Sequence, residues 1–445
     1  MRTHLSNAAY GILDYGAYPI GMLAVAPVVL HHLGAAQYGV WAVATAAVST
    51  GGVVASGFGD ANIQHVASRR GLGEQGALEP AVRSLMGINL VLGAALATAG
   101  WMLSPLAAAH VTAAGAELRQ SCLWSLRIAS VLMLMRAIES VCISTQRAFE
   151  RYGAAVRVSV LARLLALAVA AGLTLAGGNV VAIMAATGLL MTAALGLQLA
   201  ELKLLLGVKS LMPAFDREAM RVLLGFGTFS WLQAVSGVIF TQVDRLMLGV
   251  SLGASAVASY ALCAQLAQPI FGFAAAGLHF LFPYLANRRA ARGSKGAGSS
   301  LLEPVLIAFA CNLAYVAVAS GALLLFGDFI LRTWAGAAIA RSASPVLHVI
   351  VWSSALLGLN VTATYALMAL GRVRIVTWFN LAGGGIMLLL MVYLTPRMGI
   401  RGVALARLSY ALVPLCLYLP LCRHVFGKST VSAGAPALRP VCEEP

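Results

Sequence analysis

The stretch that decides the fold runs from Thr241 to Tyr260 and reads TQVDRLMLGVSLGASAVASY. It places an acidic and a basic residue near the end of a long apolar helix, and a Leu-Gly turn and a second apolar helix follow. A related stretch lies near the N-terminus, where LGAAQYGVWA at 33–42 aligns with LGASAVASYA at 252–261 at a constant shift, 252 − 33 = 219. The same shift brings SRR at 68–70 onto NRR at 287–289 without a gap. The chain is therefore predicted to contain two copies of one unit.

The composition predicts an all-α polytopic membrane protein. Of the 445 residues, 60% are hydrophobic and only 10% are charged, whereas a soluble domain is about a quarter charged. Apolar runs of about 20 residues, long enough to cross the hydrocarbon core as helices, recur along the whole chain. Helices also satisfy their own backbone groups in lipid. We predict twelve spans, at 8–30, 37–59, 84–106, 119–143, 157–176, 180–202, 222–248, 254–283, 304–326, 345–368, 376–395 and 402–422.

The basic residues predict how these spans are oriented. With the N-terminus in the cytoplasm, the even-numbered loops and both termini hold 20 of the 30 Lys and Arg residues. The outer loops and span edges hold 5, and the other 5 lie inside spans. Because short loops rich in Lys and Arg stay on the cytoplasmic side, both termini are expected to be cytoplasmic. The basic residues of the predicted cytoplasmic loops explain the net charge of +15. We therefore expect no nucleic-acid partner.

Six spans in each copy give the two copies the same orientation. We therefore expect two parallel six-helix bundles, related by a pseudo-two-fold axis along the membrane normal. Later in each copy the shift drifts to about 221, which aligns Arg151 with Arg372. The predicted divisions are an N-terminal bundle at 1–215, a C-terminal bundle at 216–425 and a cytoplasmic tail at 426–445. Transporters built from such repeats place the substrate path between the halves.

Polar groups inside spans are candidate site residues, because they are costly in hydrocarbon. Tyr10, Asp14 and Tyr18 recur every four residues and share one helix face, and the repeat aligns Asp14 with Gln233. We predict that these four residues line a substrate cavity, and that Asp14 and Asp244 are candidate groups for ion coupling. Interhelical hydrogen bonding that holds the bundle together is the alternative role for both carboxylates.

The fourth predicted span carries Arg127, Arg136 and Glu139. Arg136 and Glu139 are three residues apart and can pair on one face, so we favour a structural role for them, with ion coupling by Glu139 as the alternative. At a shift of 221, Arg127 aligns with His348 in the tenth span. These two basic groups are predicted to bind an anionic ligand, since the guanidinium fork matches phosphate oxygens. Snorkelling of Arg127 to the outer headgroups is the alternative.

Three further arginines inside spans receive local roles. Arg245 directly follows Asp244 and is a candidate to neutralise it near the membrane interface. Arg163 and Arg407 lie nearer the ends of their spans. We expect both of these side chains to snorkel to the headgroups.

The sequence resembles the bacterial polysaccharide flippases, the O-antigen and exopolysaccharide branch of the multidrug/oligosaccharidyl-lipid/polysaccharide exporter superfamily. The resemblance rests on LGAAQYGVWA, GFGDANIQHVASRR, FSWLQAVSGVIFTQVDRLMLG, SLGASAVASYALCAQL, ALGRVRIVTWFNLAGG and YLTPRMGIRGVALARLSYAL. It implies two six-helix bundles in a V, a central cavity and alternating access. The implied substrate is an undecaprenyl-diphosphate-linked oligosaccharide, carried from the cytoplasmic to the periplasmic leaflet of a bacterial inner membrane. For such a substrate, Arg127 and His348 are predicted to flank the diphosphate. Lipid II flippases of the same superfamily usually have two more spans.

Two alternatives to a flippase stay open from the sequence. A cation-coupled multidrug exporter of the same superfamily would favour an acidic pocket, whereas basic groups outnumber acidic ones inside these spans. A membrane oligosaccharide polymerase or ligase would need a large outer loop, and the outer loops here are short. The chain has no GxxxxGK[ST], GxSxG or HExxH motif, so we expect neither enzyme activity nor a cofactor or metal ion.

The expected partners are membrane lipid and the lipid-linked oligosaccharide. Coupling to a proton or to sodium is left open, as is contact with a polymerase of the same pathway.

Overall fold

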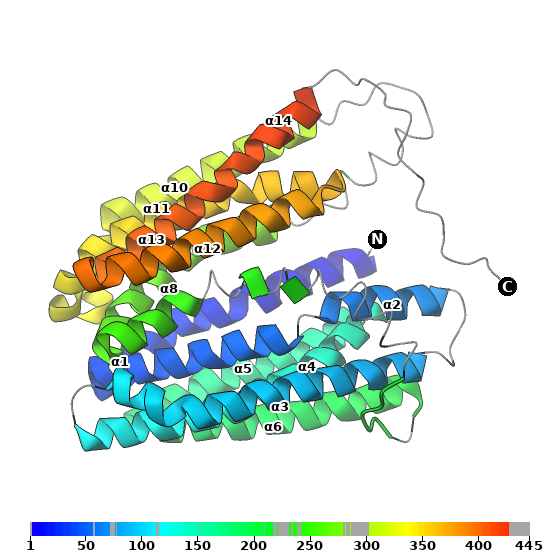
Figure 1. Ribbon diagram of the computed structural model, residues 1–445, viewed down its shortest axis with the longest axis horizontal. Helices are drawn as coiled ribbons and strands as arrows, with labels where there is room; N and C mark the ends of the chain where they lie inside the picture. The colour runs from blue at the N-terminus through cyan, green and yellow to red at the C-terminus, as the bar shows by residue number, and fades with distance from the viewer. Residues whose placement is uncertain are drawn as a thin grey trace.

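The first helix of the structure, α1 (Arg2–Ser56), contains the first two predicted spans and is broken at Gly34. In this computed structural model Gly34 has a φ of 78° and a ψ of 168°, a conformation that glycine adopts without steric cost. The chain turns back there, so the two arms of α1 run antiparallel (Figure 1). The structure describes residues 2–56, 58–71, 76, 78–112, 115–149, 151–208, 210–216, 220, 231–232, 235–237, 242–278, 281, 285 and 302–426, with the side chains of α1 from Gly16 onward.

The first half of the chain forms one helical bundle. The other five helices pack around α4, which contacts α1, α2, α3, α5 and α6. An apolar cluster that includes Val66, Val82, Val141 and Leu202 holds α2, α3, α4 and α6 together. After α1 the helices of this half are α2 (Gly59–Gly71), α3 (Leu78–Val111), α4 (Ala116–Ala148), α5 (Tyr152–Leu175) and α6 (Val180–Leu206).

The second half forms a matching bundle in which α11 is the central helix. It packs against α8, α10 and α13. Pro414 occupies the start of η2, a 3₁₀ segment that joins α13 to α14. Besides the described parts of the seventh span, this half contains α8 (Ala254–Leu278), α10 (Leu302–Ala335), α11 (Ala337–Ala369), α12 (Val373–Met398), α13 (Ile400–Leu412), η2 (Val413–Leu417) and α14 (Tyr418–Phe426).

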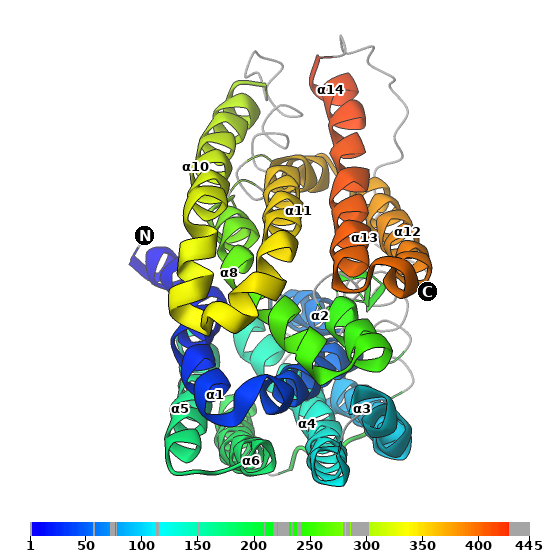
Figure 2. The ribbon, with the colours of Figure 1, turned by 90° about the vertical axis from the view of Figure 1, so that its left-hand side faces the viewer.

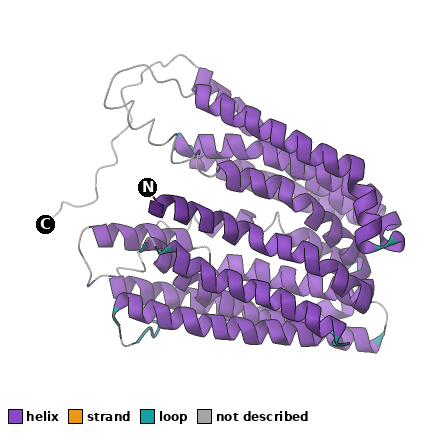
Figure 3. Ribbon diagram, turned by 180° about the vertical axis from the view of Figure 1, so that it is seen from behind, coloured by secondary structure: helices purple, strands orange, loops and turns teal. Residues whose placement is uncertain are grey.

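The predicted all-α membrane fold is confirmed. Helices make up nearly all of the described ranges, and none of these residues lies in a strand (Figure 3). Within the same ranges, nine helices are long and apolar enough to cross a membrane. Gly34 divides one of them into two spans. The fourth predicted span, in α4, is less apolar because it carries several charged residues, and most of the seventh span lies outside the described residues.

The two halves repeat the same local contacts. The turn at Gly34 has its counterpart at Gly253, 219 residues on, and the turn at Gly115 has its counterpart at Gly336, 221 residues on; all four have a φ between 78° and 88°. Asn89 of α3 donates to the carbonyl oxygen of Ala137 in α4, at 2.9 Å. In the second half Asn312 of α10 donates to the carbonyl oxygen of Gly358 in α11, at 2.8 Å. The shifts inferred from sequence therefore describe a structural repeat.

The halves pack closely at one end of the molecule. We call the end with the Gly34 turn the far end, and the end where α1 begins and α14 finishes the terminal end. At the far end a Cβ on Gly39 would overlap the carbonyl oxygen of Ala254, so the backbones of α1 and α8 are in direct contact. The Tyr38 hydroxyl donates to Gln265 at 3.2 Å. Toward the terminal end the two bundles diverge (Figures 1 and 2).

The segment after α6 belongs with the first half. Arg83 Nε donates to the Met212 carbonyl oxygen at 2.8 Å, and the backbone N–H of Asp216 donates to Ser84 Oγ at 3.1 Å. The boundary predicted at 215/216 falls next to this anchored segment. It stays a prediction, as does the tail at 426–445, which lies outside the described residues except for the last residue of α14.

Candidate substrate cavity

A cavity of about 600 Å³ lies between the two halves. The first half contributes residues from both arms of α1, including Tyr18 and Thr45. The second half contributes the seventh span, α8, α11, α12 and the α13–η2 segment. Contacts between halves flank it, since Gly16 lies against Phe273 of α8 and Trp231 Nε1 donates to the Val54 carbonyl oxygen at 2.8 Å. The cavity therefore lies where a substrate would contact both bundles.

Two arginines stand in the cavity wall. Arg245 comes from the seventh span and Arg407 from α13. Among the lining residues that the structure describes, none is an aspartate or a glutamate. The Arg245 guanidinium forms no hydrogen bond or ion pair with the described residues, and its Nε is buried without a partner. Because buried donors are almost always paired, this cation is available to an anionic ligand.

Arg407 is held by a buried carboxylate. Asp244 is completely buried, and its Oδ2 accepts hydrogen bonds from Arg407 Nη1 and, at 2.6 Å, from the Tyr260 hydroxyl. Its Oδ1 accepts the backbone N–H of Arg245 at 2.8 Å. The ion pair joins the seventh span to α13, and the Tyr260 hydrogen bond joins α8 to both. The Asp244 carboxylate thus contacts both cavity arginines. It binds the guanidinium of Arg407 and the backbone N–H of Arg245.

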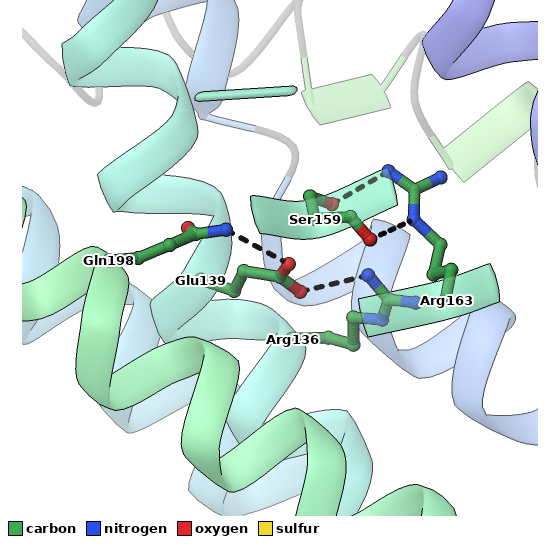
Figure 4. Close-up of polar contacts among 5 residues, drawn as sticks. All are labelled: Arg136, Glu139, Ser159, Arg163 and Gln198. Atoms are coloured by element: carbon green, nitrogen blue, oxygen red, sulfur yellow. Dashed lines mark hydrogen bonds and ion pairs between the residues drawn. The ribbon is translucent and has the colours of Figure 1, made fainter. Parts of the chain in front are cut away.

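This geometry corrects two predictions from the sequence. Arg407 does not snorkel to a headgroup, because its guanidinium pairs with Asp244 beneath the cavity wall. Arg245 is not the neutralising partner of Asp244, since Arg407 takes that role. Arg163 also has a different partner from the one expected: its Nη2 donates to Ser159 Oγ at 2.7 Å within α5 (Figure 4).

Neutral polar side chains are distributed over the remaining wall, most of whose area is apolar. Gln265 and Gln268 are one turn apart on α8, and Asn360 lies opposite on α11. Two buried acceptor atoms, Gln242 Oε1 and Asn360 Oδ1, have no hydrogen-bond partner. Unpaired buried acceptors are costly, so a ligand that donates hydrogen bonds would stabilise this part of the wall.

The predicted cavity residues have different outcomes. Tyr18 lines the cavity. The side chains of Tyr10 and Asp14, and the whole of Gln233, lie outside the described residues, so their roles stay predictions. Asp244 lies behind the wall, and its role in ion coupling also stays a prediction.

Glu139 lies inside the first bundle rather than in the cavity lining. It is buried, accepts Arg136 Nη1 at 2.8 Å, and accepts Gln198 Nε2 of α6 at 3.4 Å (Figure 4). Arg136 in turn packs against Gly52 of α1, where an added Cβ would come within 3.0 Å of the Arg136 Cβ. This supports the structural role that we favoured for the Arg136–Glu139 pair.

Arg127 and His348 are not brought together at the cavity. Arg127 lies between the rings of Trp101 and Trp124, with its Cζ 5.0 and 5.1 Å from the two ring centroids. His348 Nδ1 donates to the carbonyl oxygen of Ser344, one turn earlier in α11, at 3.0 Å. Neither residue lines the cavity. The diphosphate role predicted for this pair stays a prediction, and the positions of the two residues do not support it.

Two helical bundles with a cavity between them form an arrangement that membrane transporters built from repeats use. The sequence matches the family described as polysaccharide biosynthesis protein over residues 7–288. The chain belongs to this family. A comparison with curated proteins gives no match.

Solved structures with the same fold include both transporters and a flippase. An inward-facing multidrug resistance transporter of the MATE family superposes with a TM-score of 0.72 at 16% identity, covering 95% of this chain and 96% of that one. The lipid II flippase MurJ, in an inward closed conformation, superposes with a TM-score of 0.73 at 13% identity, covering 93% and 87%. An outward-facing MATE transporter gives a TM-score of 0.63 at 15% identity, covering 95% of each chain.

Proposed function

We propose that this protein moves an undecaprenyl-diphosphate-linked oligosaccharide from the cytoplasmic to the periplasmic leaflet of a bacterial inner membrane. The observation that carries the proposal is the unpartnered Arg245 guanidinium in the cavity between the halves. A diphosphate that leaves water loses several kcal/mol or more of hydration free energy per charge. A fixed cation in the cavity can offset this loss. Arg245 supplies such a cation, and its planar fork can bind two phosphate oxygens at once.

The rest of the wall is suited to an oligosaccharide. Sugar hydroxyls both donate and accept hydrogen bonds, and the amides of Gln242, Gln268 and Asn360 offer both functions. Phe271 and Tyr365 add aromatic surface to the same cavity, and such rings pack against the apolar faces of ligands. The cavity therefore offers groups for both parts of the proposed headgroup.

Alternating access is supported by the asymmetry of the contacts between the halves. At the far end Gly39 touches Ala254, and Trp334 Nε1 donates to the Leu23 carbonyl oxygen at 2.9 Å. If the termini are cytoplasmic, as the distribution of basic residues predicts, the far end is periplasmic and this conformation is closed on that side. Substrate would then enter from the cytoplasmic leaflet. Parallel six-helix repeats exchange access by rocking about such a site.

The multidrug exporter is the less favoured alternative. A cationic drug would need a carboxylate in the cavity, and the described lining residues offer two arginines and no carboxylate. Asp14 is the acidic group that could change this balance, and its side chain lies outside the described residues.

The proposal is tested by titrating the purified protein in nanodiscs with undecaprenyl diphosphate. Arg245→Gln should raise the Kd about tenfold or more, because a charge-assisted hydrogen bond contributes about 1.5–3 kcal/mol. Arg245→Lys should have a smaller effect, since the charge remains and the fork is lost. Arg397→Gln is the matched control, because this exposed arginine stacks on Tyr393 of its own helix, away from the cavity. Equal affinity of the parent and Arg245→Gln would contradict the proposal.

A further inference from the structure

The face formed by α3 and α4 presents one arginine between two tryptophans. The Arg127 Cζ is 5.0 Å from the centroid of the Trp101 ring and 5.1 Å from that of the Trp124 ring. Both tryptophans are 42% exposed, so the cluster lies on the surface of the bundle. A cation this close to the face of an aromatic ring is attracted to it, so the two rings hold the guanidinium in place.

The guanidinium of Arg127 has unused hydrogen-bond donors. Its Nε is buried without a partner, and no described residue accepts a hydrogen bond from this side chain or forms an ion pair with it. Two other arginines of the first half do have acceptors: Arg136 pairs with Glu139, and Arg163 donates to Ser159. The tryptophans thus orient Arg127 without satisfying its N–H groups, so an acceptor from outside the protein is needed.

The depth of this group in the membrane indicates where that acceptor comes from. Helices α3 and α4 have 34 and 33 residues, so each is about 50 Å long and extends about 10 Å beyond a 30 Å hydrocarbon core at each end. Trp124 lies 124 − 116 = 8 residues into α4, or about 12 Å from its far end. The guanidinium at this level therefore lies at the boundary between hydrocarbon and headgroups, where tryptophans are also enriched.

The surroundings of Arg127 match the other parts of a phospholipid. The exposed Val131, one helical turn further from the far end on α4, would contact acyl chains. Beyond it, toward the far end, a hollow of about 510 Å³ between α3 and α4 is lined by Thr112, Arg119 and Gln120, among others. This hollow has room and polar groups for a headgroup. Glu117 lies in the first turn of α4, near Arg119. The two positive charges of Arg119 and Arg127 and the one negative charge of Glu117 give this end of α4 a net charge of about +1.

We propose that this face binds one anionic phospholipid of the leaflet at the far end, with the lipid phosphate on Arg127 and the headgroup in the hollow beside Arg119. A planar, pre-oriented guanidinium favours the bidentate phosphate contact. The net positive charge of the face favours an anionic headgroup over a zwitterionic one, whose ammonium group would meet Arg119. The site lies outside the cavity and does not depend on the transport function proposed above.

The test is native mass spectrometry of the purified protein, titrated with phosphatidylglycerol and phosphatidylcholine of identical acyl chains. The parent should bind phosphatidylglycerol more tightly. Arg127→Gln should raise the Kd for phosphatidylglycerol about tenfold, as expected for one charge-assisted hydrogen bond. It should weaken the preference between the lipids, because the face loses one positive charge while Arg119 remains. Arg127→Lys should fall between the two. Arg397→Gln is the control, because Arg397 also stacks on an aromatic ring but its Nη1 already donates to the Tyr393 carbonyl oxygen, at 2.6 Å.

Three results would overturn the proposal. One is a parent protein without a preference for phosphatidylglycerol. Another is an Arg127→Gln variant whose Kd lies within twofold of the parent value. The third combines two observations: an equimolar amount of undecaprenyl diphosphate displaces phosphatidylglycerol from the parent, and the Arg127→Gln variant no longer binds undecaprenyl diphosphate. The face would then belong to the substrate path. Quenching of tryptophan fluorescence by brominated phosphatidylglycerol, which should fall in Trp101→Phe, places the bound lipid independently of the affinity measurements.

Discussion

Replacing Asp244 by asparagine isolates the charge of the buried carboxylate. Asparagine has nearly the same shape and still accepts a hydrogen bond from the Tyr260 hydroxyl, so the main loss is the ion pair with Arg407. Removing one partner of a buried ion pair costs about 3–5 kcal/mol. The Arg407 side chain is 14% exposed, whereas that of Asp244 is fully buried. Because the cavity partly hydrates Arg407, we expect the lower end of that range, about 3 kcal/mol.

The double variant distinguishes the pair from a general packing effect. Asp244→Asn combined with Arg407→Gln removes both charges, and neutral replacements of buried ion pairs are often tolerated. The double variant should therefore lie within about 1 kcal/mol of the parent, a coupling that a double-mutant cycle measures directly. The assay is the free energy of unfolding of the purified protein in mixed micelles.

The control for this cycle is Glu79→Gln. Glu79 and Arg83 form an ion pair at 3.1 Å on α3, with both side chains about a third exposed or more, so its loss should cost under about 0.5 kcal/mol. The reasoning is refuted if Asp244→Asn costs no more than Glu79→Gln. It is also refuted if the double variant loses the sum of the two single effects.

Three further predictions concern the seam, the repeat and the coupling ion. Gly39→Ala would place a Cβ against the Ala254 carbonyl oxygen. The distance between spin labels at His32 and Ser255 should therefore increase, and an unchanged distance distribution would contradict the close contact. Asn89→Ala and Asn312→Ala should each lower the free energy of unfolding by about 0.5–1.5 kcal/mol, since each removes one buried hydrogen bond between helices. A loss in one half alone would argue against equivalence. Asp14→Asn should abolish polymer export at normal membrane levels if its charge couples an ion; normal output would exclude that role.

The sequence predicted the fold well because its signals are local or periodic. Apolar run length is set by hydrocarbon thickness, and the turns at Gly34 and Gly253 carry the same short motif. The pairing of Asp244 with Arg407 has no such signal. These residues are 163 positions apart, and their contact depends on how α13 packs against the seventh span. Their nearness to span ends made snorkelling the simpler interpretation for Arg407.

The sequence repeat predicts how far along its helix a residue lies, but not which face of the helix its side chain occupies. Arg127 and His348 occupy equivalent positions in α4 and α11, as Gly115 and Gly336 do. Each residue turns a helix by about 100°, however, so alignment alone does not show which face a side chain occupies. For Arg127 the deciding contacts come from Trp101 on a neighbouring helix and Trp124 on its own. Tyr18, whose helix face was read from a periodic stripe, lines the cavity in the structure, and its contact with substrate stays a prediction.

The far-end seam has the symmetry of a dimer interface. Gly39 lies on Ala254, and the shift of 219 makes Ala258 the counterpart of Gly39 and Ala35 the counterpart of Ala254. Ala258 is fully buried in the apolar cluster that spans both halves, and Ala35 packs against that cluster. Each half thus offers the same patch of small residues to the other, as subunits do across an isologous contact. An ancestral six-helix protein could have paired with itself through this surface before the two copies were joined in one chain.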